Sequence, residues 1–196
     1  MSSHEGEGQR NTGILALQAF LSQEDEAQLI PLCLEVAEIE GFESDLKRGA
    51  KLHITLASWE VTRAELELAQ AQFASRLSGI PAITVRVSLG ESRGNGGLAC
   101  ALLPEPSDAL LQWHAQVHAR AAWPFKPWRD MDLPGSWWPH MGVCHIAESK
   151  EHLASKPLQK LREIKEVTIE RIGLVSYLGP MQVLEEVKLR RTASAP

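Results

Sequence analysis

The sequence predicts an α+β fold of two similar lobes, each an antiparallel sheet flanked by helices, with a central cleft between them. Three observations support this prediction. The expected elements follow the order β-α-β-α-β-β and then α-β-α-β-β, so that each half of the chain ends in a hairpin. Each half also holds one strand that carries a histidine. Hairpin-paired strands with helices on their outer faces are typical of α+β and mixed α/β domains.

The elements of the first lobe, residues 12–104, follow from alternation and capping signals. The alternating stretch 51–59 is followed by Thr62, a good N-cap for a helix rich in Ala, Glu, Leu and Gln. Pro31 predicts a kink in the first helix, and Asn95-Gly96 predicts a hairpin turn. The expected strands are 13–19, 51–59, 82–89 and 98–103, and the expected helices are 22–40 and 63–77.

The second lobe covers residues 105–190, and an exchange of strands between the two lobes stays open. This lobe contains an irregular stretch at 123–138 that is rich in Trp and Pro. A helix after it is expected to be interrupted near Pro157. The polar ends of the chain, 1–11 and 191–196, are expected to be flexible tails outside a single domain spanning 12–190. The expected helices are 107–122 and 149–164, and the expected strands are 139–146, 167–177 and 183–189.

Composition excludes several classes of protein. The 196 residues carry a net charge of −5, which gives no general attraction to nucleic acid. No apolar run is long enough to span a membrane, and the N-terminus lacks the apolar core of a secretory signal. Three cysteines without a C-x-x-C pair disfavour disulfides and a zinc cluster, and indicate a reducing compartment, the cytoplasm or the nucleus. We expect a monomer without metal or cofactor.

The stretch LHITL, residues 52–56, carries the first candidate site. Side chains alternate along a strand, so its three aliphatic residues point into the core. His53, Thr55 and Ala57 are expected to share the other face. His53 and Thr55 then lie about 7 Å apart, a distance that suits two groups holding one small anion.

A similar pattern occurs in the second half, in WWPHMGVCHI, residues 137–146. His140 and Gly142 are predicted to share a face, at the positions that His53 and Thr55 hold in the first half. If the two strands lie near each other in the sheet, both imidazoles face one cleft.

Two imidazoles without a metal suit the opening of a cyclic phosphodiester. A neutral histidine accepts a proton from the attacking water, and a protonated histidine donates a proton to the leaving oxygen. Imidazoles reach both states near neutral pH. A neighbouring hydroxyl, such as that of Thr55, can hold the non-bridging oxygens on which charge develops.

HITL at 53–56 and WPHMGV at 138–143 resemble the paired H-x-T/S-x motifs of the two-histidine (2H) phosphoesterase superfamily, which includes 2′-5′ RNA ligase-like proteins and cyclic nucleotide phosphodiesterases. The resemblance implies that His53 and His140 are the acid–base pair and that Thr55 binds phosphate. Gly142 departs from the motif because it lacks the expected hydroxyl. Its backbone, or the room it leaves, would then serve the substrate.

These residues predict a metal-independent phosphodiesterase that opens a 2′,3′-cyclic phosphate, or a related cyclic phosphodiester, on a nucleotide or RNA end. Three alternatives stay open. The resemblance allows reversible 2′-5′ RNA ligation. Gly142 favours a nucleotide-binding module with weakened catalysis. A structural protein with incidental histidines is the third.

Other aromatic and histidine residues are candidates for the same site. Trp138, two residues before His140, is predicted to stack on a base of the substrate, and Tyr177 is predicted to reach the site from the end of a late strand. His114 and His118 are expected on an exposed helix face. His145 is expected on the strand face opposite His140, in a structural role.

Overall fold

The computed structural model describes residues 12–40, 51–94 and 97–191. The expected tail at 1–11, residues 192–196 of the expected C-terminal tail and the Asn95-Gly96 turn lie outside these residues. Arg191, which the sequence placed in the C-terminal tail, is described, and its Nε lies 2.8 Å from Oε1 of Glu170.

The α+β prediction is confirmed, and most predicted elements are found within a few residues of their expected bounds. The strands are β1 (Thr12–Leu21), β2 (His53–Thr62), β3 (Ile83–Gly94), β4 (Gly97–Pro104), β5 (Lys126–Pro127), β6 (Met141–Ala147), β7 (Glu166–Ser176) and β8 (Gln182–Lys188). The helices are α1 (Gln23–Glu40), α2 (Arg63–Leu77), α3 (Asp108–Arg120) and α4 (Glu151–Glu163), with short 3₁₀ turns η1 (Asp130–Asp132) and η2 (Glu148–Lys150).

All named strands belong to one antiparallel sheet, in the order β5-β2-β1-β7-β3-β4-β6, with β8 also paired to β7. The long strand β7 joins the two ends of this sheet. Its first residues pair with β3, its later residues pair with β8, and β1 runs along its other edge. The strand pairing therefore crosses residue 104, where the sequence placed the boundary between lobes. That division stays a prediction.

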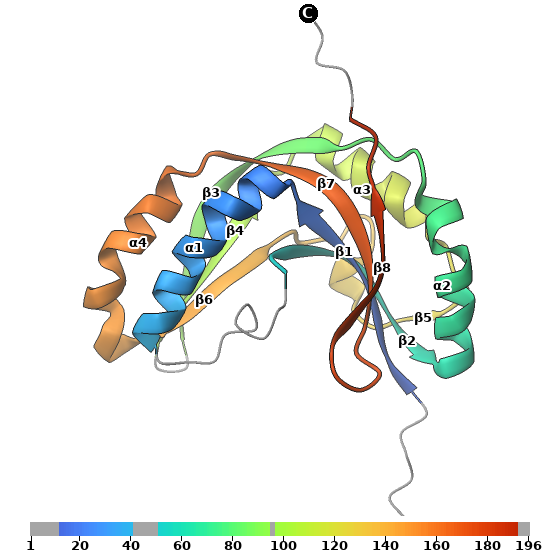
Figure 1. The fold of residues 1–196 in the computed structure, drawn as a ribbon, viewed down its shortest axis with the longest axis horizontal. Helices are drawn as coiled ribbons and strands as arrows, with labels where there is room; N and C mark the ends of the chain where they lie inside the picture. Colours follow the sequence, from blue (N-terminus) through green and yellow to red (C-terminus); the bar gives the residue numbers. More distant parts are fainter. Residues whose placement is uncertain (1–11, 41–50, 95–96, 192–196) are drawn as a thin grey trace, which may run out of the picture.

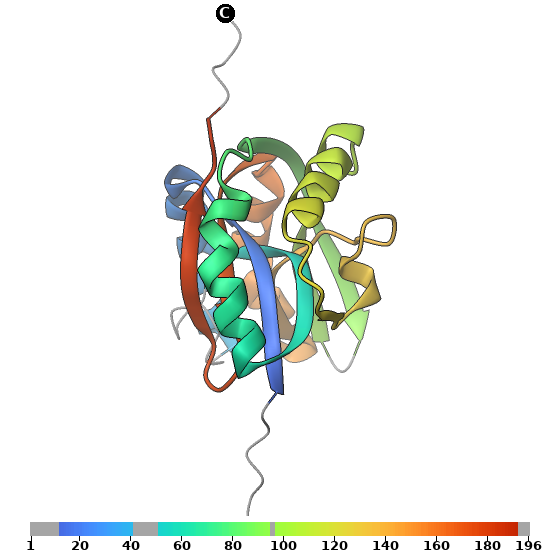
Figure 2. The ribbon, with the colours of Figure 1, turned by 90° about the vertical axis from the view of Figure 1, so that its right-hand side faces the viewer.

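Helices flank the sheet in two pairs (Figure 1). α1 and α4 pack against each other and over β6, and α4 also contacts β3. α2 and α3 lie at the other end of the molecule, where they contact β2 (Figure 2). The apolar faces of helices and strands meet in one buried core that includes the fully buried Leu17, Ile54, Phe73 and Leu102.

α2 begins and ends where the sequence predicted. Thr62 is its N-cap, and a capping box forms because the backbone N–H of Thr62 donates to Oε2 of Glu65 at 2.7 Å and the N–H of Glu65 donates to Oγ1 of Thr62 at 3.3 Å. Such reciprocal bonds satisfy two N–H groups that the first turn leaves without partners.

The predicted interruption of α4 near Pro157 is wrong. The helix continues through this residue from Glu151 to Glu163. Pro157, Leu158 and Leu161 are buried on the same apolar face. Packing of that face offsets the backbone hydrogen bond that proline cannot make.

Candidate functional site

The two histidine motifs lie where β2 and β6 begin. His53 is the first residue of β2. His140 was predicted to lie within a strand over 139–146, but β6 begins at Met141, so His140 lies one residue before it. β2 and β6 contact each other, and their first residues lie side by side near the middle of Figure 1. The fold therefore brings two segments from opposite halves of the chain together.

The ring of His53 is held by the chain just before it. Its Nδ1 lies 2.9 Å from the carbonyl oxygen of Lys51. A carbonyl oxygen can only accept, so Nδ1 carries the hydrogen and donates it. Nε2 is then the ring atom that can exchange a proton.

His140 is held in the same way. Its Nδ1 donates to the carbonyl oxygen of Trp138 at 3.1 Å, again two residues earlier in the chain. The indole of Trp138 stacks on the imidazole, with ring centroids 4.5 Å apart and an angle of 28° between the planes. Trp138 is itself 55 % exposed, so most of its ring area is open to contact. The two motifs thus fix the same tautomer by the same contact.

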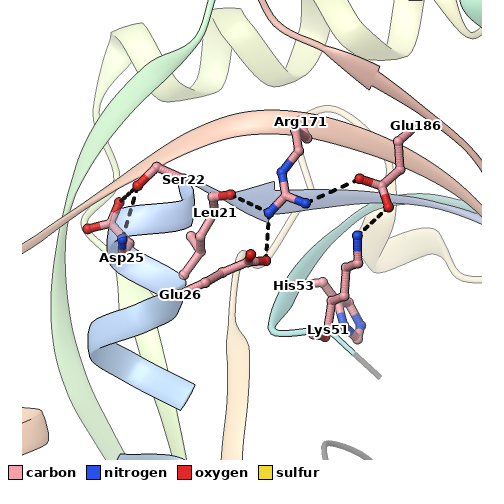
Figure 3. Close-up of polar contacts among 8 residues, drawn as sticks. All are labelled: Leu21, Ser22, Asp25, Glu26, Lys51, His53, Arg171 and Glu186. Carbon is pink, nitrogen blue, oxygen red and sulfur yellow. Dashed lines mark hydrogen bonds and ion pairs between the residues drawn. The ribbon is translucent and has the colours of Figure 1, made fainter. Parts of the chain in front are cut away.

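Lys51, which orients His53, is itself anchored by charge. Its ammonium pairs with Glu186 on β8, and Glu186 also pairs with the guanidinium of Arg171 at 3.2 Å (Figure 3). Arg171 Nη2 lies 2.7 Å from Oε1 of Glu26 on α1 and donates to the carbonyl oxygen of Leu21 at 2.7 Å. Partly buried ion pairs of this kind resist screening by salt. They tie the start of β2 to β7, β8 and α1.

Thr55 lies beside a buried amide that the sequence analysis missed. It is half-buried, and its register partner on β1 is Gln18, which is 3 % exposed. Nε2 of Gln18 donates to the phenol oxygen of Tyr177 at 2.9 Å, which places Tyr177 near Thr55. A lone amide in the apolar run LALQAF was the signal that could have identified Gln18.

The predicted face of β2 is wrong beyond Thr55. Leu17 pairs with Ala57 and Gln18 pairs with Thr55, so Leu56 is an extra residue without a partner on β1. Such a bulge reverses the alternation that follows it. Ala57 therefore turns into the core. Ser58 takes its place on the other face, where its hydroxyl donates to the buried carboxylate of Asp132.

A second bulge changes β6. Cys100 pairs with Cys144 and Ala101 pairs with Gly142, which leaves Val143 as the extra residue. His145 is therefore exposed on the same side as Gly142, which corrects the prediction that it lies opposite the His140 motif. A Cβ added at Gly142 would meet no atom within 4 Å outside its two chain neighbours, so this glycine leaves open space.

The prediction that His114 is exposed is wrong as well. It is 1 % exposed and lies on the buried face of α3 with Leu110, Trp113 and Val117. Desolvation by this burial lowers the pKa of His114 below its usual value, although the hydrogen bond to the carbonyl of Leu56 opposes the shift. The three- and four-residue spacing of its apolar neighbours was a signal of burial.

Within residues 12–40, 51–94 and 97–191, no three His, Cys, Asp or Glu side chains lie close enough to hold a metal ion. None of the helices in this described part of the chain has the length and apolar character needed to cross a membrane.

Comparison with known proteins places this geometry in a family. Among solved structures, the chain is similar to TT0787 of Thermus thermophilus (17 % identity, TM-score 0.53, covering 92 % of this chain and 100 % of that one). It is also similar to LigT of E. coli complexed with ATP (17 %, 0.50, 91 % and 98 %). A protein described as a phosphoesterase matches comparably (16 %, 0.52, 90 % and 98 %). These likenesses support the fold, and no curated protein matches the chain.

The family model of the 2′-5′ RNA ligase superfamily matches residues 29–180, which include both histidine motifs. This range is most of the chain. The protein therefore belongs to the 2′-5′ RNA ligase superfamily of two-histidine (2H) phosphoesterases.

Proposed function

We propose that this protein opens a 2′,3′-cyclic phosphate, or a related cyclic phosphodiester, on a nucleotide or RNA end without a metal ion. The observation that carries the proposal is the matched anchoring of His53 and His140. Each ring donates its Nδ1 hydrogen to the carbonyl oxygen two residues before it. This contact reserves Nε2 of both rings for proton transfer.

The chemistry needs one ring of each protonation state. The neutral imidazole accepts a proton from water at Nε2 as the water oxygen bonds to phosphorus. The protonated imidazole gives its Nε2 proton to the leaving ribose oxygen as the P–O bond breaks. The product is a phosphomonoester with a free neighbouring hydroxyl. In this scheme the hydroxyl of Thr55 donates to a non-bridging phosphoryl oxygen, where negative charge increases.

Aromatic side chains near the motifs support a nucleotide as substrate. Trp138 has an exposed ring beside His140, and a base can stack on such a ring. Tyr177 is 37 % exposed and contacts Gln18 beside Thr55. In the proposed complex, Trp138 contacts the base and Tyr177 contacts the sugar or phosphate.

Two further functions have specific support. The family match allows 2′-5′ RNA ligation, in which the same two histidines would act on two RNA ends. The missing hydroxyl at Gly142 favours a module that binds cyclic nucleotides with little turnover.

The three cysteines are free thiols, which supports a reducing compartment such as the cytoplasm or nucleus.

Turnover of the four 2′,3′-cyclic nucleotides in EDTA tests the proposal. We expect a bell-shaped dependence of kcat/KM on pH and a loss of about 10²-fold or more in His53→Ala and in His140→Ala. His152→Ala is the matched control, since His152 is an exposed residue of α4. Full activity of both site variants would contradict the proposal. Tight binding of the nucleotides without turnover would favour the binding module, and joining of RNA ends would favour the ligase.

A further inference from the structure

The bulge in β2 interrupts the pairing of this strand with β1 at Leu56. Leu56 has no register partner on β1, and β5, the other neighbour of β2, pairs only with Trp59 and Glu60. At this point of β2, the backbone carbonyl oxygens of Thr55 and Leu56 accept hydrogen bonds from side chains outside the sheet. A buried carbonyl oxygen without a donor destabilises the fold. Both carbonyls belong to the HITL motif that carries His53.

Two buried rings supply the donors. Nε1 of Trp137 donates to the carbonyl oxygen of Thr55 at 2.9 Å, and Nε2 of His114 donates to that of Leu56 at 2.8 Å. The rings stack on each other with centroids 3.8 Å apart and planes inclined by only 3°. Trp137 is 8 % exposed and His114 is 1 % exposed. Water therefore has little access to replace either bond.

The stack also connects the two histidine motifs. Trp137 is bonded to Thr55, and it directly precedes Trp138, whose carbonyl oxygen holds the ring of His140. His114, on α3, stacks against the face of the Trp137 indole. The start of α3 is fixed in turn by its N-cap, Ser107. One connection between the two motifs thus runs through the indole of Trp137, beside the direct contact of β2 with β6.

We propose that His114 and Trp137 are a pair of positioning residues that hold the His53 strand and the segment before His140 in one fixed relation. The proposal rests on the function proposed above, since it assigns the pair to the alignment of that acid–base site. Neither ring touches the reacting atoms in this scheme. Proton transfer and phosphoryl contact require placement to a fraction of an ångström, and a shift of about 1 Å can cost about 10²-fold in rate.

Single substitutions separate the stack from its hydrogen bonds. Trp137→Phe keeps an aromatic ring and removes the donor to Thr55. His114→Phe keeps a ring against Trp137 and removes the donor to Leu56, whereas His114→Gln keeps an amide donor. Trp123→Phe is the matched control: Trp123 is also buried in the Trp-rich segment, but its Nε1 has no hydrogen-bond partner among the described residues.

Steady-state kinetics on a 2′,3′-cyclic nucleotide, well below each variant's unfolding temperature, form the first test. We expect kcat to fall about tenfold or more in Trp137→Phe and in His114→Phe, with KM changed less than about threefold. His114→Gln is expected to retain more activity than His114→Phe, and Trp123→Phe to stay close to wild type. The double variant should lose less than the product of the single losses, because the two rings act as a unit. Unchanged kcat with only a lower unfolding temperature would show a purely structural role.

A second test does not need turnover. Inorganic phosphate is titrated into protein with labelled histidine, and the ring signals of His53 and His140 are followed by NMR. In wild type we expect both rings to respond with one shared midpoint. In Trp137→Phe we expect the midpoints to move to higher phosphate concentration and to differ between the two rings. In Trp123→Phe we expect the shared midpoint of wild type.

The outcomes of the two tests distinguish a failure of the proposed function from a failure of the positioning role. If wild type shows no turnover, but Trp137→Phe still separates the two NMR midpoints, the proposed function is wrong and the positioning role stands. If wild type turns over and the stack variants keep full kcat, the function stands and the positioning role is wrong. Separate midpoints for His53 and His140 in wild type would overturn the positioning role, because no common site would exist to align.

Discussion

At the scale of single residues, the proposed function makes position 142 the place where the second motif would contact a phosphoryl oxygen. Gly142 is exposed, and a Cβ added there would meet no atom within 4 Å outside its two chain neighbours. The Cβ of a serine therefore enters open space. Its hydroxyl would supply the donor that the first motif has in Thr55.

We predict that Gly142→Ser raises kcat/KM for a 2′,3′-cyclic nucleotide about tenfold, the size expected for one more hydrogen bond to a charged oxygen. Gly142→Ala adds the same Cβ without the hydroxyl and serves as the control. Steady-state assays of both variants check the prediction. Equal kinetics for the serine and alanine variants would show that no phosphoryl oxygen lies within reach of this position.

Gly173 is constrained in the opposite way. It lies on β7 opposite Gln18, and a Cβ there would overlap the ring of Phe20, which pairs across β1 and β2 with His53. We predict that Gly173→Ala lowers the free energy of unfolding by about 1–3 kcal/mol, because the buried Phe20 must shift. Urea unfolding compares this variant with Gly142→Ala. A Gly173→Ala protein as stable as wild type would show that the ring moves freely.

At the scale of elements, the bounds of α2 were predictable because its signals are local. Thr62 and the Glu three residues later form a capping box whatever the rest of the chain does. The bulges at Leu56 and Val143 could not be predicted, since a bulge depends on which strand pairs with β2 or β6 and in which register. The faces assigned to Ala57 and His145 failed for this reason.

The capping box also predicts how the stability of α2 responds to acid. Hydrogen bonds from the backbone and then the side chain of Thr62 lower the pKa of Glu65 below 4.5, its ordinary value. A carboxylate with a lowered pKa stabilises the fold above its unfolded pKa, and the stabilisation is lost as pH falls through the folded pKa.

We predict that Thr62→Ala lowers the Tm by about 2–4 °C at pH 7 and by less at pH 3, because acid favours the protonated form of Glu65, which accepts hydrogen bonds more weakly. Thermal unfolding followed by circular dichroism at the two pH values measures the difference. Ser107, the N-cap of α3, has no acidic partner three residues later, so Ser107→Ala should lower the Tm more evenly across pH. An equal loss in Thr62→Ala at both pH values would contradict a contribution from the Glu65 carboxylate.

At the scale of the whole molecule, His53, Thr55 and His140 could be predicted as site residues from the sequence alone, because their pattern is local to two short motifs, and their roles belong to the proposed function. The contact of His114 with Trp137 was beyond such an analysis, because it depends on how α3 packs against β2 and against the segment before β6. Gln18 is an intermediate case, since its polarity was visible but its contact with Tyr177 joins residues from opposite ends of the chain.

The buried His114 and the half-buried His118 predict an acid-sensitive fold. Desolvation is the largest cause of the lowered pKa values of both His114 and His118. Below pH 6.5 the unfolded chain binds protons that the folded state resists, so stability is lost as pH falls from 6.5 towards the folded pKa values. Each site contributes a slope of at most about 1.4 kcal/mol per pH unit.

Urea unfolding between pH 7.5 and 5 measures this slope. We predict a shallower dependence in His114→Gln than in wild type, since one of the two imidazoles with a lowered pKa is then absent. His152→Ala, which removes an exposed histidine, is expected to leave the slope unchanged. A slope in His114→Gln equal to that of wild type would show that His114 does not titrate differently in the two states.

A crystal structure of the wild-type protein with bound inorganic phosphate tests the central claim most directly. The claim predicts that Nε2 of His53 and Nε2 of His140 both lie within about 2.6–3.2 Å of oxygens of the same phosphate. It also predicts that the hydroxyl of Thr55 donates a hydrogen bond to an oxygen of that phosphate. A phosphate held by only one of the two imidazoles, with the other ring directed elsewhere, would contradict it.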